Sequence, residues 1–326
     1  MSQQIDQMEQ DKYLLTNRFE VKFFSVLGAV LVGILILLFI LTYKVERGNI
    51  SSPAKLALNP FDKIELVAHS AYVYDIRTSR VLYAKNSNER LPLASLTKVM
   101  TAVVALDTTP SYSTITINRS AIMTGGDSGL RVGEKWTLRD LLDFSLTSSS
   151  NDGVAAIAFA LGALPKANIT ESSAMEDFVA QMNRKANELQ MKNTYFFNVT
   201  GLDETNVRGG AYGTAEDMAR LFSYALIKYP YIFEATSQKQ FKISSLDNII
   251  HTATNTDAIV NDIPGLRGSK TGFTTLAGGN LVIAFDPEIG RPIIISVLGS
   301  TEKDRFVDIL KLVNATIASL SQEAEK

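Results

Sequence analysis

The sequence contains no cysteine and only two histidines, His69 and His251. Without cysteine the chain has no disulfide, no thiolate-bound zinc or iron–sulfur cluster and no thiol nucleophile. With two histidines, a metal site would depend on carboxylates almost alone, and a serine nucleophile with a histidine base would have to use one of these two rings. We therefore expect neither a metal nor another cofactor.

The chain also lacks an excess of charge of one sign. Its 32 lysines and arginines nearly balance 34 aspartates and glutamates, which gives a formal net charge of −2. A protein surface that binds DNA or RNA usually carries a basic surplus, so we expect no nucleic-acid partner. The 326 residues are 46% hydrophobic and 20% charged, a balance typical of a globular chain with a buried core.

One long stretch has no charged residue. Residues 23–43 read FFSVLGAVLVGILILLFILTY, which is long enough for an α-helix to cross a hydrocarbon core of about 30 Å. The stretch is longer and starts later than the apolar part of a signal peptide, and it ends in Tyr-Lys-Val-Glu-Arg rather than at a small-residue cleavage site. We predict an uncleaved transmembrane anchor at 23–43, in contact with the lipid bilayer.

The flanks of this anchor do not fix its orientation. Lys12, Arg18 and Lys22 precede it, and Lys44, Arg47 and Lys55 follow it. With three basic residues on each side, the positive-inside rule does not favour either orientation. We interpret residues 1–22 as a short, weakly ordered tail and 44–59 as a tether with little periodicity. The folded domain is predicted at 60–321, followed by a tail at 322–326.

The folded domain has strand patterns at both ends and apolar helices between them. Residues 70–86 predict a β-hairpin, and 279–299 predict two strands joined by a turn. Helices that are apolar nearly all round are predicted from Ser95 and after Asn151, and an amphipathic helix is predicted over 300–320. This order favours an α+β fold, in which helices flank a mostly antiparallel sheet.

Ser95-Leu96-Thr97-Lys98 places a hydroxyl and an amine three residues apart at the start of an apolar helix. Residues three apart share a helix face, so the Lys98 amine can reach the Ser95 hydroxyl. Apolar surroundings lower the pKa of a lysine, which makes it a usable base near neutral pH, and N–H groups at the helix start can stabilise an oxyanion. The pattern predicts a serine nucleophile, Ser95, with Lys98 as its base.

The same spacing occurs twice more in the chain. Ser52–Lys55 lies in the tether and has no buried helix behind it. Ser300–Lys303 reads as the start of an exposed amphipathic helix, with Ser300 as the N-cap. Only the pattern at Ser95 opens a helix that would remove its lysine from water.

Two further motifs follow in order. Ser149-Ser150-Asn151 precedes the second apolar helix, where such a sequence alone is more often a helix cap. Lys270-Thr271-Gly272, followed by Phe273 and Thr274, precedes a predicted strand, where it is usually a turn, although the glycine would let a substrate backbone lie close. Together the three motifs form the set typical of penicillin-recognising serine enzymes.

The chain resembles the D-alanyl-D-alanine carboxypeptidases, the low-molecular-weight penicillin-binding proteins, in the segments PLASLTKVMTAVVALD, SSSNDGVAAIA, NVTGLDE, TAEDMARL and SKTGFTTLAGGNLV. The likeness extends from Ala71 to about Leu320. It implies a β-lactamase/transpeptidase-like fold and a serine-type D,D-carboxypeptidase that removes the terminal D-alanine from peptidoglycan stem pentapeptides. β-Lactam antibiotics would then be covalent inhibitors.

The resemblance implies a role for each catalytic residue. Ser95 would be acylated, and Lys98 would accept its proton. Ser149 would relay a proton to the leaving group, and Asn151 would orient Lys98 and the substrate amide.

The resemblance also implies how substrate is bound. Lys270 would support the serine of the second motif and attract the terminal carboxylate of the substrate, to which Thr271 and Thr274 would donate hydrogen bonds. The oxyanion hole would be formed by the backbone N–H groups of Ser95 and Phe273.

Three positions depart from the family pattern. Ser150 stands where glycine is common, Thr200 stands where histidine is frequent in the NVTGLD segment, and Ser269 precedes Lys270 where isoleucine or methionine is usual. None of these removes a reacting group, so they bear on substrate preference more than on activity.

Four other functions remain as alternatives. A D,D-endopeptidase that cuts peptidoglycan cross-links would use the same residues. A β-lactamase would commonly need a Glu-x-x-x-Asn loop, which is absent between Asn151 and Lys270. A non-catalytic binding protein would have no need for the motif residues, and a histidine-based hydrolase would lack a nucleophile motif near either histidine.

A peptidoglycan substrate would place the domain outside the cell membrane. The resemblance therefore implies a single-pass protein with a cytoplasmic N-terminus and an extracytoplasmic catalytic domain, an orientation that charge alone leaves open.

Overall fold

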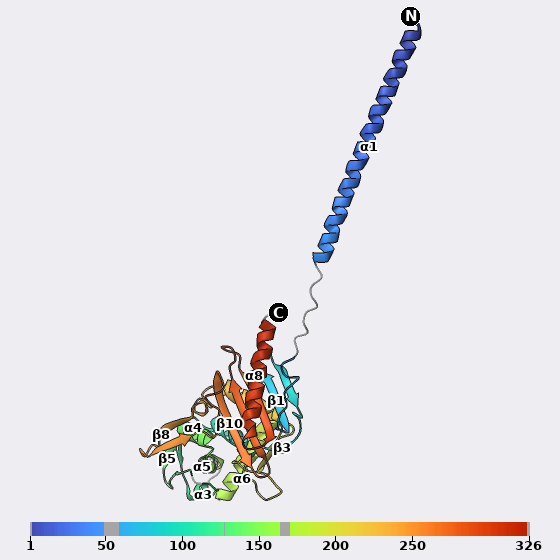
Figure 1. Ribbon diagram of the computed structural model, residues 1–326. Helices are drawn as coiled ribbons and strands as arrows, with labels where there is room; N and C mark the ends of the chain where they lie inside the picture. Colours follow the sequence, from blue (N-terminus) through green and yellow to red (C-terminus); the bar gives the residue numbers. More distant parts are fainter. Residues whose placement is uncertain (1, 49–58, 127, 164–169, 325–326) are drawn as a thin grey trace. The chain divides into compact units, whose positions relative to one another are not determined.

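The structure is a computed structural model that describes residues 2–48, 59–126, 128–163 and 170–324 (Figure 1). The chain divides into two compact units, Met1–Leu58 and Asn59–Lys326. Most of the tether expected at 44–59 lies outside the described residues, as do the last two residues of the C-terminal tail.

The first unit is described as one helix, α1 (Ser2–Gly48). Within it, Lys22–Tyr43 has a mean hydropathy of 3.0 and is not buried, so this segment is long and apolar enough to cross a membrane. The helix also includes residues 2–22 and 44–48, where we expected a weakly ordered tail and the start of the tether. The expectation of weak order in 2–22 was wrong, because these residues contain no proline or glycine and many good helix formers.

The second unit contains all the other described elements. Its strands are β1 (Ser70–Asp75), β2 (Arg80–Lys85), β3 (Leu91–Pro92), β4 (Thr114–Thr116), β5 (Lys135–Thr137), β6 (Tyr195–Phe196), β7 (Ala211–Gly213), β8 (Gln240–Ser244), β9 (Ile250–Thr254), β10 (Leu266–Thr274), β11 (Gly278–Phe285) and β12 (Ile293–Ser300). Its helices are η1 (Ala94–Leu96), α2 (Thr97–Thr108), α3 (Arg119–Ile122), α4 (Leu138–Ser148), α5 (Asn151–Gly162), α6 (Glu171–Glu188), α7 (Ala215–Lys228), η2 (Ala235–Ser237) and α8 (Asp304–Ala324).

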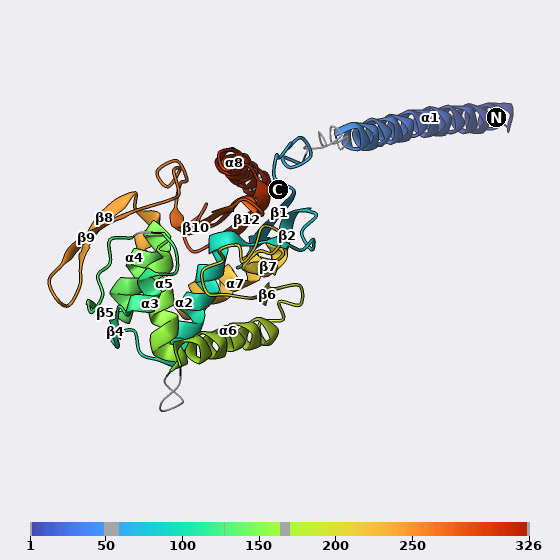
Figure 2. The ribbon, with the colours of Figure 1, turned by 90° about the horizontal axis from the view of Figure 1, so that it is seen from below.

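A five-stranded antiparallel sheet in the order β10-β11-β12-β1-β2 forms one side of this unit (Figure 2). The hairpin predicted at 70–86 is β1 and β2, and the two strands predicted within 279–299 are β11 and β12. Because β1 pairs with β12, the two ends of the domain meet in the middle of the sheet. β10 is left at the edge, with one side unpaired by the sheet.

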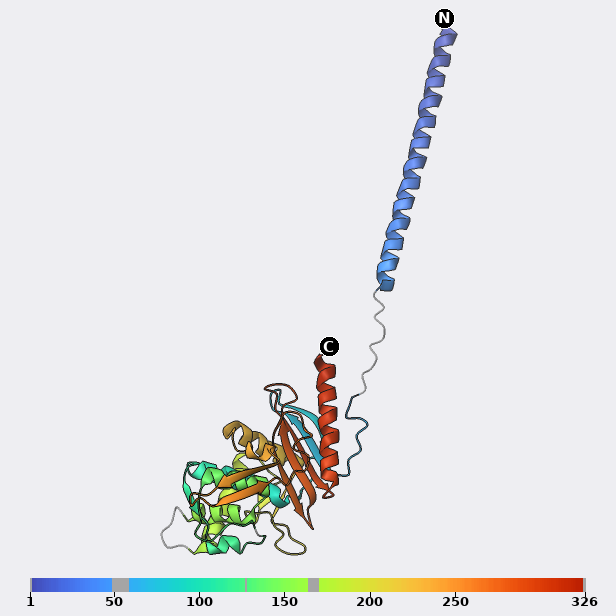
Figure 3. The same cartoon turned by 60° about the vertical axis from the view of Figure 1, so that its left-hand side comes forward.

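The two faces of the sheet bury separate cores. Ala71 and Val73 of β1 belong to a cluster with Leu312 of α8, and Figure 3 shows α8 lying along this side of the strands. Tyr72 belongs to a second, larger cluster that includes Phe222 of α7. Successive side chains of a strand point to opposite faces, so the alternation in β1 reaches both cores.

The larger cluster continues into the helical part of the unit. α2 and α5 are buried there on most sides, as their composition predicts; for example, Val99, Met100 and Val103 of α2 and Ala155 and Ile157 of α5 have no exposed surface. Both helices therefore have fixed positions, and the residues at their N-termini are held with them.

One predicted helix start was wrong. Ser300 is the last residue of β12, and its hydroxyl donates to Asp308 at 2.8 Å rather than capping a helix. α8 begins at Asp304, whose backbone N–H donates to Thr301 Oγ1 at 2.9 Å. The strand pairing with β11 extends to Ser300, so the next residue, Thr301, accepts the hydrogen bond from the free N–H at the start of α8.

Candidate active site

Lys98 Nζ lies 2.8 Å from Ser95 Oγ. Ser95 is in η1, two residues before α2 begins, and Lys98 is in the first turn of α2. The Lys98 side chain is completely buried, and its amine also donates to the carbonyl oxygen of Thr200 at 3.0 Å. Burial, and secondarily the charge of Lys270, holds the pKa of Lys98 well below its usual value. An amine in this state can accept the proton of the adjacent hydroxyl.

The backbone before Ser95 is held in an uncommon conformation. Ala94 has a φ of 48°, in the left-handed region that few non-glycine residues adopt. The backbone N–H of Leu93 donates to Ala211 O at 3.0 Å, which ties this turn to β7. Strained residues of this kind persist where surrounding contacts fix them, and they are common at functional sites.

The second motif lies at the junction of two helices. Ser149 ends α4 with a φ of 60°, and its Oγ accepts a hydrogen bond from Lys270 Nζ at 3.0 Å. Ser150 Oγ accepts from the backbone N–H of Gly153 at 3.0 Å and so caps α5. Thus the middle residue of the motif has the structural role of a helix cap, while Ser149 faces the lysine of the third motif.

Asn151 makes a contact that the sequence did not indicate. Its Nδ2 donates to Gly125 O at 2.9 Å, and its Oδ1 is buried without a hydrogen-bond partner among the described residues. The resemblance implies that Asn151 orients Lys98, whereas the partners recorded for the Lys98 amine are Ser95 and Thr200.

The third motif is part of edge strand β10 and is not a turn ahead of a strand. Lys270 is 2% exposed and donates to Thr271 O at 2.9 Å in addition to Ser149. Burial, together with the nearby charge of Arg305, lowers the pKa of Lys270 to about 7, and Asp257 acts in the opposite direction.

Gly272 allows β10 to approach the nucleophile. A Cβ at this position would lie 2.9 Å from Leu93 O and 3.2 Å from Ser95 N, which is too close for most side chains. The strand backbone is therefore in direct contact with the turn that carries Ser95. The two backbone N–H groups expected to form the oxyanion hole, those of Ser95 and Phe273, belong to these two contacting segments.

Both threonines of β10 that were expected to bind a carboxylate already have hydrogen-bond partners. Thr271 Oγ1 lies 2.5 Å from Thr256 Oγ1, and Thr274 Oγ1 donates to Asp203 Oδ1 at 2.9 Å. Phe273, between them in sequence, is 48% exposed.

The structure thus links Ser95 to Lys98, Ser149 to Lys270, and the Lys270 strand to the turn of Ser95. A family model described as D-alanyl-D-alanine carboxypeptidase matches residues 56–302, well over half of the chain. The chain belongs to the D-alanyl-D-alanine carboxypeptidase family. The family, the serine peptidase class and the D,D-carboxypeptidase function predicted from the sequence are confirmed by this match.

Curated relatives of this family member carry two kinds of name. The chain is 31% identical over 297 residues to the D-alanyl-D-alanine carboxypeptidase DacF of Bacillus subtilis, covering 88% of this chain and 69% of DacF. It is 34% identical over 279 residues to a D-alanyl-D-alanine endopeptidase of Pseudomonas aeruginosa, covering 83% of this chain and 84% of the relative.

Solved structures confirm the α+β fold class. The Streptomyces K15 DD-transpeptidase superposes with a TM-score of 0.70 at 27% identity, over 78% of this chain and 99% of that one. Penicillin-binding protein D2 of Listeria monocytogenes, solved in an ampicillin-bound form, superposes with a TM-score of 0.62 at 28% identity, over 77% of this chain and 98% of that one.

The sequence analysis of this carboxypeptidase family member missed three contributors to the site. Thr200 supplies only its backbone carbonyl to Lys98, a contact that any residue type can make. Arg305 Nη1 donates to Gly272 O at 2.8 Å, and no motif marks this residue. Asp203 binds Thr274; it lies within the NVTGLDE segment, which was quoted for the resemblance without a role for this carboxylate.

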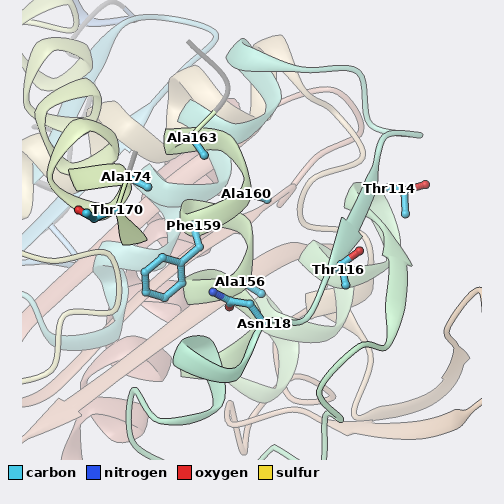
Figure 4. Close-up of a pocket in the computed structure, with 9 residues that line it drawn as sticks. All are labelled: Thr114, Thr116, Asn118, Ala156, Phe159, Ala160, Ala163, Thr170 and Ala174. Carbon is cyan, nitrogen blue, oxygen red and sulfur yellow. The ribbon is translucent and has the colours of Figure 1, made fainter. Parts of the chain in front are cut away.

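A separate pocket of about 350 Å³ lies in the helical part and contains none of the predicted site residues. Figure 4 shows alanines and Phe159 of α5 on one wall and Thr114 and Thr116 of β4 on the other. Both histidines also have structural partners: His69 pairs with Glu89 and buried His251 pairs with Glu134, each at 2.7 Å.

Proposed function

We propose that this protein removes the terminal D-alanine from peptidoglycan stem pentapeptides, with Ser95 as the nucleophile. The observation that carries the proposal is the 2.8 Å contact between Ser95 Oγ and the amine of fully buried Lys98. Burial holds the pKa of Lys98 well below its usual value, and this favours the free amine that a general base needs.

Acylation begins when Ser95 Oγ attacks the carbonyl carbon of the penultimate D-alanine. The Oγ–C bond forms as the hydroxyl proton passes to Lys98 Nζ, and the carbonyl becomes an oxyanion. The backbone N–H groups of Ser95 and Phe273 donate to this oxyanion, an interaction that supplies about 3–4 kcal/mol of transition-state stabilisation for a single donor in other enzymes.

The leaving D-alanine needs a proton on its amine. Ser149 Oγ supplies it as the C–N bond breaks, and Ser149 recovers a proton from Lys98, which took it from the nucleophile. Lys270 supports this transfer because its Nζ is 3.0 Å from Ser149 Oγ. The positive charge of Lys270 also attracts the C-terminal carboxylate of the substrate, with Thr271 and Thr274 beside it on β10.

Deacylation reverses these roles. Water attacks the Ser95 ester, Lys98 takes the proton of the water, and the shortened peptide leaves as a carboxylic acid while Ser95 regains its hydrogen. Asn151 is proposed to hold the substrate amide during both steps, since its Oδ1 is free of a recorded partner among the described residues.

The proposal is tested by incubating the protein with a synthetic stem pentapeptide and identifying the products by mass spectrometry. The expected result is a tetrapeptide and free D-alanine from the wild-type protein and neither product from Ser95→Ala. Turnover by a folded Ser95→Ala variant would contradict the assignment of the nucleophile.

A second candidate function is cleavage of D,D cross-links. The relative from Pseudomonas aeruginosa, at 34% identity, is named an endopeptidase, which favours this candidate. Both reactions break a bond that follows a D-alanine carbonyl, so the same residues would serve. Parallel assays on the pentapeptide and on a purified cross-linked dimer measure which substrate has the larger kcat/KM.

β-Lactam antibiotics are proposed as covalent inhibitors that acylate Ser95. The support is the ampicillin-bound form of a structural relative, together with the Ser95–Lys98 pair of this chain. A penicilloyl adduct that persists for minutes or longer is expected. Release of the adduct within seconds would favour a β-lactamase instead.

The proposed domain plan assigns 1–22 to a cytoplasmic tail, 23–43 to the anchor, 44–59 to a tether, 60–321 to the catalytic domain and 322–326 to a C-terminal tail. Its support is the apolar segment Lys22–Tyr43 and the need for an enzyme of the cell wall to reach its substrate outside the membrane. Protease digestion of intact cells is expected to remove the catalytic domain and to leave a short membrane-protected fragment.

A further inference from the structure

Asp203 accepts two hydrogen bonds from the turn that follows the third motif. Thr274 Oγ1 donates to Asp203 Oδ1 at 2.9 Å, and the backbone N–H of Leu276 donates to Asp203 Oδ2 at 3.3 Å. Thr274 Oγ1 in turn accepts from the backbone N–H of Ala277 at 3.1 Å. The carboxylate therefore holds both the hydroxyl and the backbone of the segment that joins β10 to β11.

The segment that carries Asp203 also contacts the other half of the site. Its Thr200 carbonyl accepts from the Lys98 amine at 3.0 Å. Asn198 makes the segment rigid, because its Oδ1 accepts from the backbone N–H groups of Thr200 and Gly201, at 3.2 and 2.8 Å. Residues 198–203 thus connect the proposed base to the proposed carboxylate-binding strand.

The conformation of this segment depends on a glycine. Gly201 has a φ of 81°, and a Cβ there would lie 1.8 Å from Ala94 O, the residue before the nucleophile. The segment is therefore pressed against the turn of Ser95 at one point and bound to Thr274 at another. Because Gly201 is packed against the backbone of Ala94, a displacement of Asp203 would move Thr274 rather than Gly201.

We propose that Asp203 is a positioning residue that holds Thr274 and the β10–β11 turn in place for the C-terminal carboxylate of the substrate. The inference rests on the proposed function. Thr274 has a single hydroxyl hydrogen, which it gives to Asp203 in the free protein. This bond and the N–H of Ala277 hold the Thr274 oxygen in position before a substrate carboxylate arrives.

Two substitutions separate positioning from charge. Asp203→Ala removes both hydrogen bonds, so KM for the pentapeptide is expected to rise about tenfold, the effect of losing a hydrogen bond to a charged group, while kcat changes little. Asp203→Asn keeps an amide oxygen that can accept from Thr274, so it is expected to restore KM to within about threefold of the wild-type value. If Asp203→Asn is as impaired as Asp203→Ala, or if kcat falls with KM unchanged, the proposal is overturned.

A double mutant tests whether Asp203 acts through Thr274. In a Thr274→Val protein the hydroxyl is absent and Asp203 holds the turn only through the N–H of Leu276, so adding Asp203→Ala is expected to raise KM by about threefold, less than in the wild-type background. An undiminished tenfold effect in that background would show that Asp203 acts elsewhere and would reject the proposal.

The matched control is Glu204→Ala. Glu204 is the next residue and lines the same pocket of about 390 Å³ beside Leu276, but its carboxylate pairs with Arg208 at 3.2 Å. Its KM is expected to stay at the wild-type value, and thermal unfolding verifies that each variant is folded. An inactive wild-type protein would refute the proposed function, whereas an active wild-type protein with an unchanged Asp203→Ala variant would refute only the role of Asp203.

Discussion

Lys270 Nζ donates to Ser149 Oγ at 3.0 Å, and this hydrogen bond joins two residues that are 121 positions apart. Lys270 lies on edge strand β10, and Ser149 ends helix α4. The bond therefore forms only when the sheet and the helical part of the domain are packed together. The proposed proton-transfer residue and the proposed carboxylate-binding strand are therefore placed by the same contact.

Removal of the Ser149 hydroxyl is expected to slow turnover. Ser149→Ala deletes the proposed proton donor and the partner of Lys270, so kcat for the pentapeptide is expected to fall by about 10²- to 10⁴-fold, the range of general acid–base catalysis. Ser148→Ala is the matched control, because Ser148 Oγ donates to Phe144 O within α4. Equal activities for the two variants would remove Ser149 from the mechanism.

The pH dependence of kcat/KM reports the free protein, in which the pKa of Lys270 is about 7. Lys270 is charged below this pH and loses its charge above it, so kcat/KM is expected to fall as the pH rises through about 7. On the acid side, kcat/KM falls when Lys98 becomes protonated. Lys270→Arg keeps its charge at all these pH values, so its alkaline limb is expected to disappear or to move to much higher pH.

Arg305 gives an independent test of the fall in kcat/KM at alkaline pH. Its charge lowers the pKa of Lys270, and its Nη1 donates to Gly272 O at 2.8 Å. Arg305→Gln removes the positive charge, so the pKa of Lys270 and the alkaline limb of kcat/KM are expected to rise. Lys303→Gln is the control, because it removes the positive charge of an exposed side chain two residues before Arg305. An alkaline limb that stays in place in Arg305→Gln would disprove the electrostatic link.

The close approach of β10 to Ser95 predicts that Gly272 tolerates no side chain. The Cβ of Gly272→Ala would meet Leu93 O at 2.9 Å and push the strand away from the nucleophile. A misplacement of this kind is expected to lower the rate of acylation by a fluorescent penicillin by about 10²-fold. Gly209→Ala meets only ordinary contacts, at 3.4 Å or more, and should label at the wild-type rate.

The parts of the fold that the sequence predicts are those with a local signature. The hairpin of β1 and β2 and the strands β11 and β12 are marked by their own β-branched and aromatic residues, and the helices α2 and α5 by continuous apolar runs. Short strands such as β3 and β6, of two residues each, are too short to show such a signature. The N-cap at Ser300 was predicted wrongly because strand pairing with a distant segment decides where α8 begins.

In the candidate site, too, the sequence predicts contacts within one turn but not contacts between distant segments. Ser95 and Lys98 are neighbours on one turn, so their spacing already predicts the contact. The contacts of Lys98 with Thr200 O and of Asn151 with Gly125 O use backbone carbonyls, which have no side-chain signature. Asp203 and Thr274 are 71 residues apart, and only the folded chain brings them together.

The central claim is that Lys98 is an uncharged amine beside Ser95 at neutral pH. The most direct test is an NMR titration of the protein labelled at the lysine side-chain carbons, with the Lys98 signal assigned by its absence from Lys98→Met. The account predicts a pKa for Lys98 far below the ordinary lysine value of about 10.4. A Lys98 signal that titrates near that ordinary value would mean a charged lysine at neutral pH and would contradict the account.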